Sequence, residues 1–185
     1  MGKYKRWINT NLPGQTCYVT STCLDFAHLF ARNSVKTRMA LSILRDCKFY
    51  GAKLHAFVIM SHHLHLLVTP KSDETISGLM RNVKRRSANI LKPMLTEFEK
   101  RQLGGQMGLN HHSFWKEGFR GLPVFTSLVF QQKLNYIHEN PVRAEIETYA
   151  AAYNWSSAKQ YEAGNFVDEN LLDLDKCIQF YERLL

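Results

Sequence analysis

The chain has 185 residues, of which 45% are hydrophobic and 22% are charged, so it is long enough and apolar enough for one folded domain with a buried core. Its longest apolar runs are far shorter than the ~20 residues that span a bilayer, and its N-terminus lacks the apolar segment of a signal peptide. The four cysteines form no CxxC pair, which argues against a zinc ribbon or a disulfide framework. We therefore expect a cytoplasmic protein without a membrane partner.

The formal net charge is +8, and a surplus of this size favours a polyanionic partner. The densest basic cluster lies in "RNVKRRSANILK", residues 81–92. One such cluster can also be the solvated face of a helix. Together with the charge of the whole chain, however, it makes nucleic acid the leading candidate partner.

The chain begins with a strand-like and then a helix-like segment. Residues 15–23 alternate in hydrophobicity and are rich in β-branched and aromatic side chains, which predicts a strand. Residues 34–51 have apolar side chains at helical spacing. Ser34 is the expected N-cap of this helix, and Gly51 its stop.

A hairpin and a second helix follow. Residues 52–60 and 62–70 are two β-rich runs with a short connection, which predicts an antiparallel hairpin. Residues 72–92 predict a helix, with Ser72 or Asp73 as its N-cap and acidic side chains in its first turn.

The second half of the chain starts with a polar, glycine-containing segment, residues 93–110, which predicts a loop. Residues 111–125 indicate a short strand or hairpin. Residues 126–140 predict a helix that ends before Pro141, because the residue before a proline is disfavoured in the helical region.

Two short helices are expected near the C-terminus, within residues 154–164 and 170–185. The element order predicts an α+β fold, with a ferredoxin-like or RRM-like antiparallel sheet, helices on one face, and additional C-terminal helices. We expect one domain over residues 1–185, in which the segment from about 163 to 185 is a helical extension.

The stretch "MSHHLHLLVTP", residues 60–70, places three histidines in the second strand of the hairpin. Because alternate side chains of a strand share a face, His63 and His65 lie together, opposite the leucines that enter the core. His62 falls at the turn or on the apolar face. Two imidazoles two positions apart can bind one divalent metal, although such histidines also occur as hydrogen-bonded core residues.

The helix before Pro141 carries a second candidate pair. Tyr136 and Asn140 are four residues apart, which places both on one helix face. An asparagine carbonyl oxygen is a suitable ligand for Mg²⁺ or Mn²⁺, and a phenol oxygen can attack a phosphate that a metal polarises. The same spacing also fits an ordinary amphipathic helix, so the spacing alone leaves both readings open.

Together these motifs resemble the IS200-like transposase superfamily, the Y1 transposases with a histidine-hydrophobe-histidine motif, and within it the REP-associated tyrosine transposases. The stretch 60–70 is similar to the metal-binding strand of that family, and "YIHENPVRAEI", residues 136–146, to the end of its catalytic helix. "YNWSSAKQY", residues 153–161, is similar to a Trp-Ser-Ser segment of the REP-associated branch. "FWKEGFR", residues 114–120, stands where the family has a tryptophan-containing strand. The resemblance covers residues 15–162.

This resemblance implies that His63 and His65 bind a divalent metal, Mg²⁺ or Mn²⁺, with Asn140 as a third ligand. It implies that Tyr136 is the nucleophile. The expected substrate is single-stranded DNA near a hairpin, which is joined to the tyrosine through its 5′ phosphate while a 3′ hydroxyl is freed. Such a protein is expected in the cytoplasm, associated with the nucleoid.

The resemblance also assigns the basic cluster to the backbone phosphates of a DNA hairpin. The residues expected to make these contacts are Arg81, Lys84, Arg85 and Arg86. IS200-type enzymes commonly exchange the tyrosine helix within a dimer, whereas the REP-associated branch can act as a monomer. The sequence therefore leaves open a monomer or a homodimer.

Three positions, at two places in the chain, depart from the family pattern. Ser61 and His62 stand where the family commonly has Pro-Asn, and we expect this to alter the turn. Glu145 stands where many relatives have glycine, and an acidic side chain there is expected to weaken a DNA contact. Neither change removes a catalytic group.

Three alternatives remain. The first is a catalytically silent, domesticated DNA-binding regulator with the same fold. The second is a metal-dependent hydrolase that does not use the tyrosine, but it would need a further ligand and an acid or base, and Glu139 points away from the face of Tyr136 and Asn140. The third is an RNA-binding domain, which would need exposed aromatic side chains where this strand has histidines.

Overall fold

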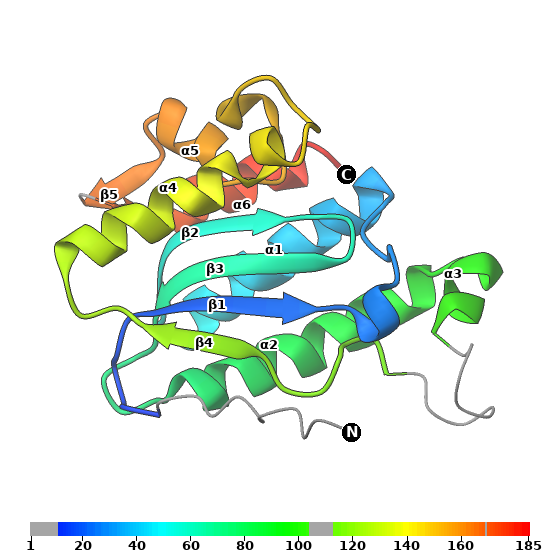
Figure 1. Ribbon diagram of the computed structural model, residues 1–185, viewed down its shortest axis with the longest axis horizontal. Coiled ribbons are helices and arrows are strands. Elements are labelled where there is room, and N and C mark those ends of the chain that lie inside the picture. Colours follow the sequence, from blue (N-terminus) through cyan, green and yellow to red (C-terminus); the bar gives the residue numbers. More distant parts are fainter. Residues whose placement is uncertain (1–10, 104–112, 169) are drawn as a thin grey trace, which may run out of the picture.

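A four-stranded antiparallel sheet with the strand order β2-β3-β1-β4 forms the centre of the molecule (Figure 1). The computed structural model describes residues 11–103, 113–168 and 170–185. The strands of this sheet are β1 (Cys17–Thr22), β2 (Lys53–Ile59), β3 (His63–Thr69) and β4 (Arg120–Pro123). The predicted first strand and the predicted hairpin are confirmed, and so is the α+β class.

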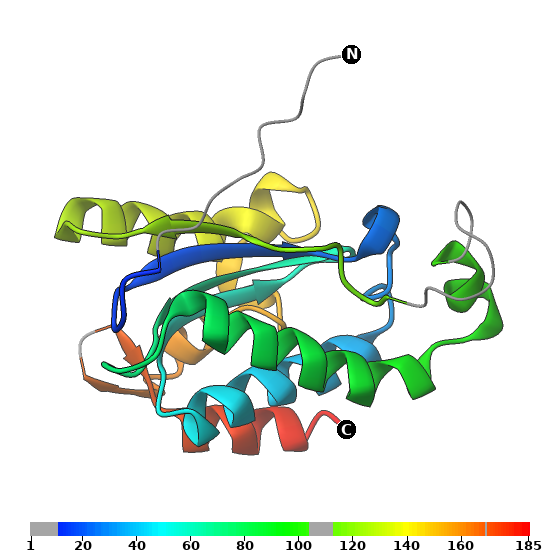
Figure 2. The ribbon, with the colours of Figure 1, turned by 90° about the horizontal axis from the view of Figure 1, so that it is seen from below.

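Helices lie on both faces of this sheet (Figure 2). On one face, α1 (Asn33–Phe49) and α2 (Ile76–Leu91) pack over the leucine side of β3 and enclose the main core. On the opposite face, α4 (Ser127–Arg143) packs through Leu134 and Ile137 on side chains of β2 and β3. The prediction of two helices on one face is confirmed, and α4 adds a layer on the other.

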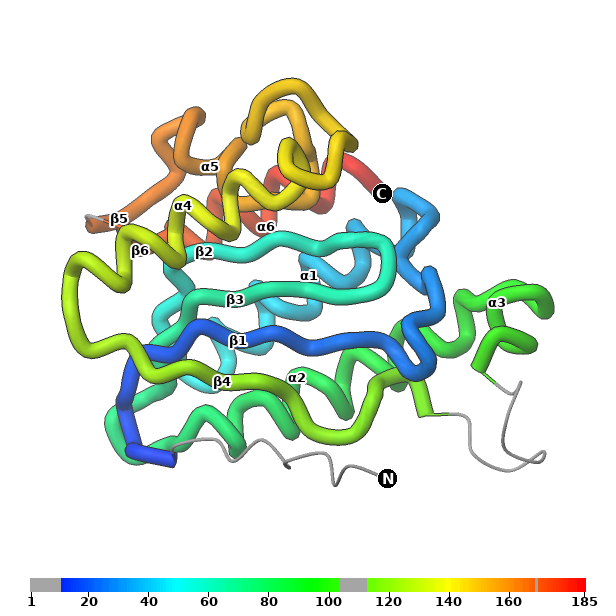
Figure 3. The backbone as a smooth tube through the Cα atoms, in the orientation of Figure 1, coloured from blue at the N-terminus to red at the C-terminus, as the bar shows by residue number. Residues whose placement is uncertain are grey.

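The remaining elements are short and surround this core (Figure 3). They are α3 (Glu97–Gln102), α5 (Ala158–Glu162), α6 (Leu174–Glu182), β5 (Phe166–Asp168), β6 (Leu171–Leu172) and the 3-10 helices Leu24–Phe26, Lys92–Met94 and Ala150–Ala152. Across the described ranges, no helix is both long enough and apolar enough to cross a membrane.

The segment 93–110, predicted as a loop, contains α3. Thr96 and Glu99 form a capping box there, in which each side chain bonds to the backbone of the other residue, and this stabilises a helix start in a polar stretch. Residues 104–110 of the predicted loop, and residues 111 and 112 of the predicted strand, lie outside the described residues.

The C-terminal extension, predicted as helical, contains a two-stranded sheet before its helix. β5 pairs with β6 in antiparallel orientation, and α6 follows directly. Cys177 and Tyr181 of α6 have no exposed surface and belong to the main core. The extension is therefore part of the domain's packing.

Helix starts differ from the predicted caps. α1 begins at Asn33, and its N-cap is Arg32, which lies two residues before the predicted N-cap Ser34. The cap of α2 is Thr75, whose hydroxyl accepts a hydrogen bond from the Gly78 N–H at 3.2 Å, in place of Ser72 or Asp73. The predicted stop of the first helix is confirmed, because Gly51 has a φ of +65° just after α1.

The predicted end of α4 at Asn140 is wrong, because the helix continues through Pro141 to Arg143. Proline lacks an N–H and so removes the hydrogen bond to the carbonyl group four residues earlier. In the last turn of a helix this is a single lost bond. Pro141 is also buried, so its ring contributes packing in the same place.

A Schellman motif closes α4. The Ile146 N–H donates to the Pro141 carbonyl at 2.9 Å, and the Glu145 N–H donates to the Val142 carbonyl at 3.0 Å. Glu145 has a φ of 56°, in the left-handed region that favours glycine. A glycine at this position would adopt this φ without strain, independent of any DNA contact.

The segment around Trp155 and Ser157 anchors α4 to the edge of β2. The Ile59 N–H donates to the Trp155 carbonyl at 2.9 Å, and the Ser157 N–H donates to the Phe57 carbonyl at 2.8 Å. The Ser157 hydroxyl accepts from the Phe57 N–H and lies 2.9 Å from Nε2 of His138 on α4. The Trp-Ser-Ser motif is therefore a structural tether for the helix that carries Tyr136.

Candidate metal and nucleophile site

The two predicted ligand histidines lie on the α4 side of β3. Register with β1 places His65 opposite Thr20, and His63 opposite Thr22. The ring centroids of the two histidines are 4.9 Å apart. Leu64 and its alternate neighbours enter the main core on the other side, so the predicted alternation is confirmed.

Tyr136 reaches the same place from α4. Its ring centroid is 5.6 Å from that of His65, and it meets the ring of Tyr18 edge-on at 6.0 Å. Asn140 follows one turn later on α4 and is half-buried. The structure thus brings the predicted nucleophile to the predicted ligands within one chain.

Two hydroxyl groups of β1 hold the ring of His65. Its Nδ1 lies 2.8 Å from the Tyr18 hydroxyl and 2.9 Å from the Thr20 hydroxyl. This arrangement leaves Nε2 as the nitrogen for another partner. The sequence reasoning missed these two residues, since their alternation on β1 was visible but the strand pairing was not.

Both histidines are held as neutral imidazoles. Burial lowers the pKa of His63 to about 4, with a further contribution from His62. Burial lowers the pKa of His65 to about 3, with contributions from His63 and Lys133. A neutral imidazole has a free lone pair for a metal ion, whereas an imidazolium has none.

One imidazole nitrogen also lacks a partner. Nδ1 of His63 is buried and has no hydrogen-bond partner among the described residues. Such an atom is costly unless a ligand or water satisfies it. Together with Nε2 of His65, it provides two nitrogen donors on one strand, which fits a divalent metal.

A metal ion at these two nitrogens would need oxygen donors as well. Within the described residues, no three side chains of His, Cys, Asp and Glu converge to hold a metal ion. The amide oxygen of Asn140 is on the helix face of Tyr136, and substrate phosphate oxygens are further donors of the kind that Mg²⁺ and Mn²⁺ prefer.

Two cations that the sequence reasoning missed lie against the ring of Tyr136, and a third lies on the same sheet face. Lys133 Nζ lies 5.9 Å and the guanidinium carbon of Arg143 lies 5.4 Å from the centroid of the Tyr136 ring. Arg120 pairs with Thr20 across β4 and β1, so its exposed side chain lies on the same sheet face. Helical spacing of three and seven residues from Tyr136 was the available signal for the first two.

Two other histidines lie nearby. His62 stands at the turn before β3, as predicted, with its ring 5.2 Å from His28 and 4.5 Å from His63. His138 points away from the site to Ser157, and burial lowers its pKa to about 4. It serves the tether of α4.

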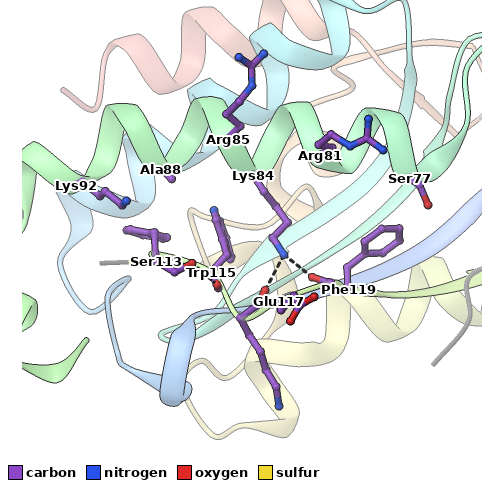
Figure 4. Close-up of a pocket in the computed structure, with 13 residues that line it drawn as sticks. Ser77, Arg81, Lys84, Arg85, Ala88, Lys92, Ser113, Trp115, Glu117 and Phe119 are labelled. Carbon is purple, nitrogen blue, oxygen red and sulfur yellow. Dashed lines mark hydrogen bonds between the residues drawn. The ribbon is translucent and has the colours of Figure 1, made fainter. Parts of the chain in front are cut away.

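The basic cluster lines a cavity of about 580 Å³ between α2 and the segment 113–119 (Figure 4). Arg81 and Arg85 are exposed on its rim. The segment runs beside the end of β1, where the Lys116 N–H donates to the Thr22 carbonyl at 2.9 Å. Since Thr22 pairs with His63, the cavity lies at the end of the sheet at which β3 begins.

The other two predicted DNA contacts are engaged within the protein. Lys84 Nζ donates to the Lys116 carbonyl at 2.7 Å and to the Gly118 carbonyl (Figure 4), and burial lowers its pKa to about 8. Arg86 Nε lies 2.6 Å from the Asp46 carboxylate, which is 2% exposed. Lys84 therefore holds the cavity wall, and Arg86 joins α2 to α1.

Comparison with known proteins agrees with this geometry. The family described as "Transposase IS200 like" matches residues 22–140, which is more than half of the chain. Among solved structures, a REP-associated tyrosine transposase bound to a REP hairpin is 19% identical, with coverage of 88% of this chain and 86% of that chain and a TM-score of 0.63. At this identity the likeness shows a shared fold.

A candidate transposase of Deinococcus radiodurans R1 is 18% identical, with coverage of 75% of this chain and 97% of that chain. Its TM-score of 0.47 is too low to carry an argument. The comparison with curated proteins gave no match.

Proposed function

The chain belongs to the IS200-like transposase family, and on that premise we propose that it cuts and rejoins single-stranded DNA through a covalent bond to Tyr136. The phenol oxygen attacks a DNA phosphorus, the bond from phosphorus to the 3′ oxygen breaks, and that oxygen takes up a proton. The products are a 5′-phosphotyrosine and a free 3′ hydroxyl, and the reverse attack rejoins a strand. The observation that carries this proposal is the 5.6 Å between the rings of His65 and Tyr136.

His63 and His65 are the proposed ligands of Mg²⁺ or Mn²⁺, with the amide oxygen of Asn140 as a third. The neutral imidazoles and the unpartnered Nδ1 of His63 support this assignment. A bound divalent ion would supply Lewis-acid polarisation of the reacting phosphate. The chain's own contribution is to hold the nucleophile and the ligands at fixed positions on α4 and β3.

Positive side chains around Tyr136 support attack at neutral pH. A free phenol ionises near pH ~10, so the attacking oxygen needs positive charge close to it. Lys133 and Arg143 lie against the Tyr136 ring, and Arg120 lies on the same sheet face. We assign these three residues to the phosphate that reacts, whose charge they also stabilise.

The DNA flanking the reacting phosphate is assigned to α2. Arg81 and Arg85 are exposed and are proposed to contact backbone phosphates at the cavity, although the Arg85 guanidinium also donates to the Asn82 amide oxygen at 3.4 Å. Lys84 and Arg86 act through the protein contacts described above. The similar structure is that of a REP-associated tyrosine transposase bound to a REP hairpin, so we propose a hairpin-containing single strand as the substrate class and membership of the REP-associated branch.

The tether of α4 supports a cis arrangement. His138 on that helix bonds to Ser157, which bonds in turn to Phe57 on β2 of the same chain. A helix exchanged between two copies would have to rebuild these bonds. We therefore propose that each chain completes its own site and acts as a monomer, in preference to a helix-swapped homodimer.

The test is adduct formation on a single-stranded oligonucleotide that contains a hairpin. With Mn²⁺ present, the protein is expected to form a covalent complex that survives denaturing electrophoresis, and Tyr136→Phe is expected to form none. Tyr149→Phe is the matched control, because Tyr149 is 56% exposed and outside the site, and it should retain the adduct. An adduct on Tyr136→Phe would assign the nucleophile elsewhere.

The metal role has a separate test. His63→Ala combined with His65→Ala is expected to abolish cleavage while hairpin binding without metal persists. Cleavage that survives in this variant would refute the ligand assignment. Persistent hairpin binding with no cleavage by the unaltered protein would instead support the regulator alternative.

A further inference from the structure

Tyr18 has contacts to both halves of the proposed site. Its hydroxyl lies 2.8 Å from Nδ1 of His65, and its ring meets the ring of Tyr136 edge-on at 6.0 Å. Lys133 Nζ lies 5.0 Å from the centroid of the same Tyr18 ring. Among the described residues, Tyr18 alone combines a hydroxyl contact to His65 with a ring contact to Tyr136.

We propose that Tyr18, together with Thr20, is a positioning residue that fixes the metal-facing nitrogen of His65 and ties this ligand to the nucleophile. The inference rests on the proposed function, because it requires a metal at His65. Both residues act on the metal site through His65, and Tyr18 also acts on the nucleophile through its contact with Tyr136.

The tautomer of His65 gives the physical reason. A neutral imidazole that offers the lone pair of Nε2 to a metal must carry its proton on Nδ1. The hydroxyl oxygens of Tyr18 and Thr20, at 2.8 and 2.9 Å, are the acceptors for that proton. Such partners hold the ring in orientation and raise the basicity of the ligating nitrogen.

The direction of the hydrogen bonds at His65 also determines what the Tyr18 O–H can do for Tyr136. When the Tyr18 oxygen accepts from Nδ1, its own O–H is free to donate to another atom. The Tyr136 side chain is a neighbour of that group, since its ring meets the Tyr18 ring edge-on at 6.0 Å. A Tyr18 O–H directed at the Tyr136 oxygen would hold the phenol oxygen for attack.

The two hydroxyls share one nitrogen atom, so each can replace part of the other's contribution. Removal of one is expected to have a small effect on metal binding, and removal of both a large one. Of these two residues, only Tyr18 contacts Tyr136, so removal of its hydroxyl is expected to slow the reaction more than removal of the Thr20 hydroxyl does. This difference separates a positioning role from a general contribution to folding.

The experiment measures Mn²⁺ affinity of the DNA-free protein by titration of the free-ion electron paramagnetic resonance signal. Tyr18→Phe combined with Thr20→Val is expected to bind Mn²⁺ about 10- to 100-fold more weakly than the unaltered protein. Tyr18→Phe combined with Thr20→Ser keeps one hydroxyl and is expected to restore most of the affinity. Near-ultraviolet circular dichroism checks the fold of each variant.

Each outcome decides a different point. If the unaltered protein binds no Mn²⁺, the metal role in the proposed function fails. If it binds Mn²⁺ and the variant without both hydroxyls binds equally well, the positioning inference alone is refuted. The same holds if the serine variant fails to restore affinity in a folded protein.

A kinetic comparison tests the link to Tyr136. At saturating Mn²⁺, Tyr18→Phe should lower the single-turnover rate of adduct formation without a change in the DNA concentration at half-saturation. Thr20→Val should lower this rate less than Tyr18→Phe does, because Thr20 contacts only the ligand His65. Equal losses in both variants would refute the link from Tyr18 to the nucleophile.

Discussion

The ion pair between Asp46 on α1 and Arg86 on α2 gives a sharp test of the energetics between the two core helices. Oδ1 of Asp46 receives the Arg86 Nε–H at 2.6 Å, but its Oδ2 is buried without a hydrogen-bond partner among the described residues. Burial raises the pKa of Asp46 to about 6, against the opposing effect of Arg86. Desolvation therefore outweighs the attraction of the partner charge.

The sign of the pH dependence follows from this rise. The folded protein binds a proton on Asp46 more tightly than the unfolded chain does, so stability falls as pH rises through the window from 3.8 to about 6. At ~1.4 kcal/mol per pKa unit, the whole window is worth about 3 kcal/mol. Between pH 5 and pH 7, about 1 kcal/mol of stability is lost through this one carboxylate.

Asp46→Asn removes the titration and keeps the shape of the side chain. The free energy of unfolding of this variant, relative to the unaltered protein, is expected to rise by about 1 kcal/mol when pH increases from 5 to 7. Urea denaturation at both pH values measures this difference. Asp175→Asn, which breaks an exposed pair with Lys48, is the matched control for loss of one negative charge. A difference that shrinks with pH would show that Arg86 outweighs burial and would refute the reasoning.

Three further predictions concern α2 and α4. In hairpin-binding titrations against salt, Arg81→Gln should reduce the slope of log affinity by ~0.7, whereas Arg86→Gln should leave it nearly unchanged; equal changes would mean that Arg86 contacts DNA. Glu145→Gly should raise the free energy of unfolding by up to ~1 kcal/mol, because it relieves a left-handed φ, and Glu147→Gly, its control, should give no such gain. Ser157→Ala should lower stability by ~1–3 kcal/mol in urea denaturation and slow adduct formation, since buried partners lose their bonds; full stability would contradict the tether.

Local patterns in the sequence were sufficient for much of the fold. Alternation in β3 correctly separated His63 and His65 from the leucines, because one strand face meets the core. Helical spacing placed Tyr136 on a face that meets the histidines. These features depend on side-chain periodicity, which a sequence displays directly.

Other features depend on pairings between distant segments. Tyr18 and Thr20 are 47 and 45 positions from His65, and only the register of β1 with β3 brings them to it. The internal bonds of Lys84 and Arg86 likewise require the positions of a loop and of α1. α4 continues past Asn140 because the chain closes the helix only after Pro141. This closure overrides the preference of a residue before proline for a non-helical backbone.

β3 has consequences for how such a chain can change by insertion and deletion. One of its faces supplies Leu64 and Leu66 to the core, and the other presents His63 and His65 to the site. A single residue inserted between these positions would turn the leucines that follow it toward the site and the histidines toward the core. The packing of the core and the proposed metal ligands would then be lost together. Length changes inside this strand are therefore tolerable only in steps of two, whereas a change in the turn at Ser61 leaves the alternation of β3 intact. Lineages of this protein should show such changes in the turn and none of odd length in the strand.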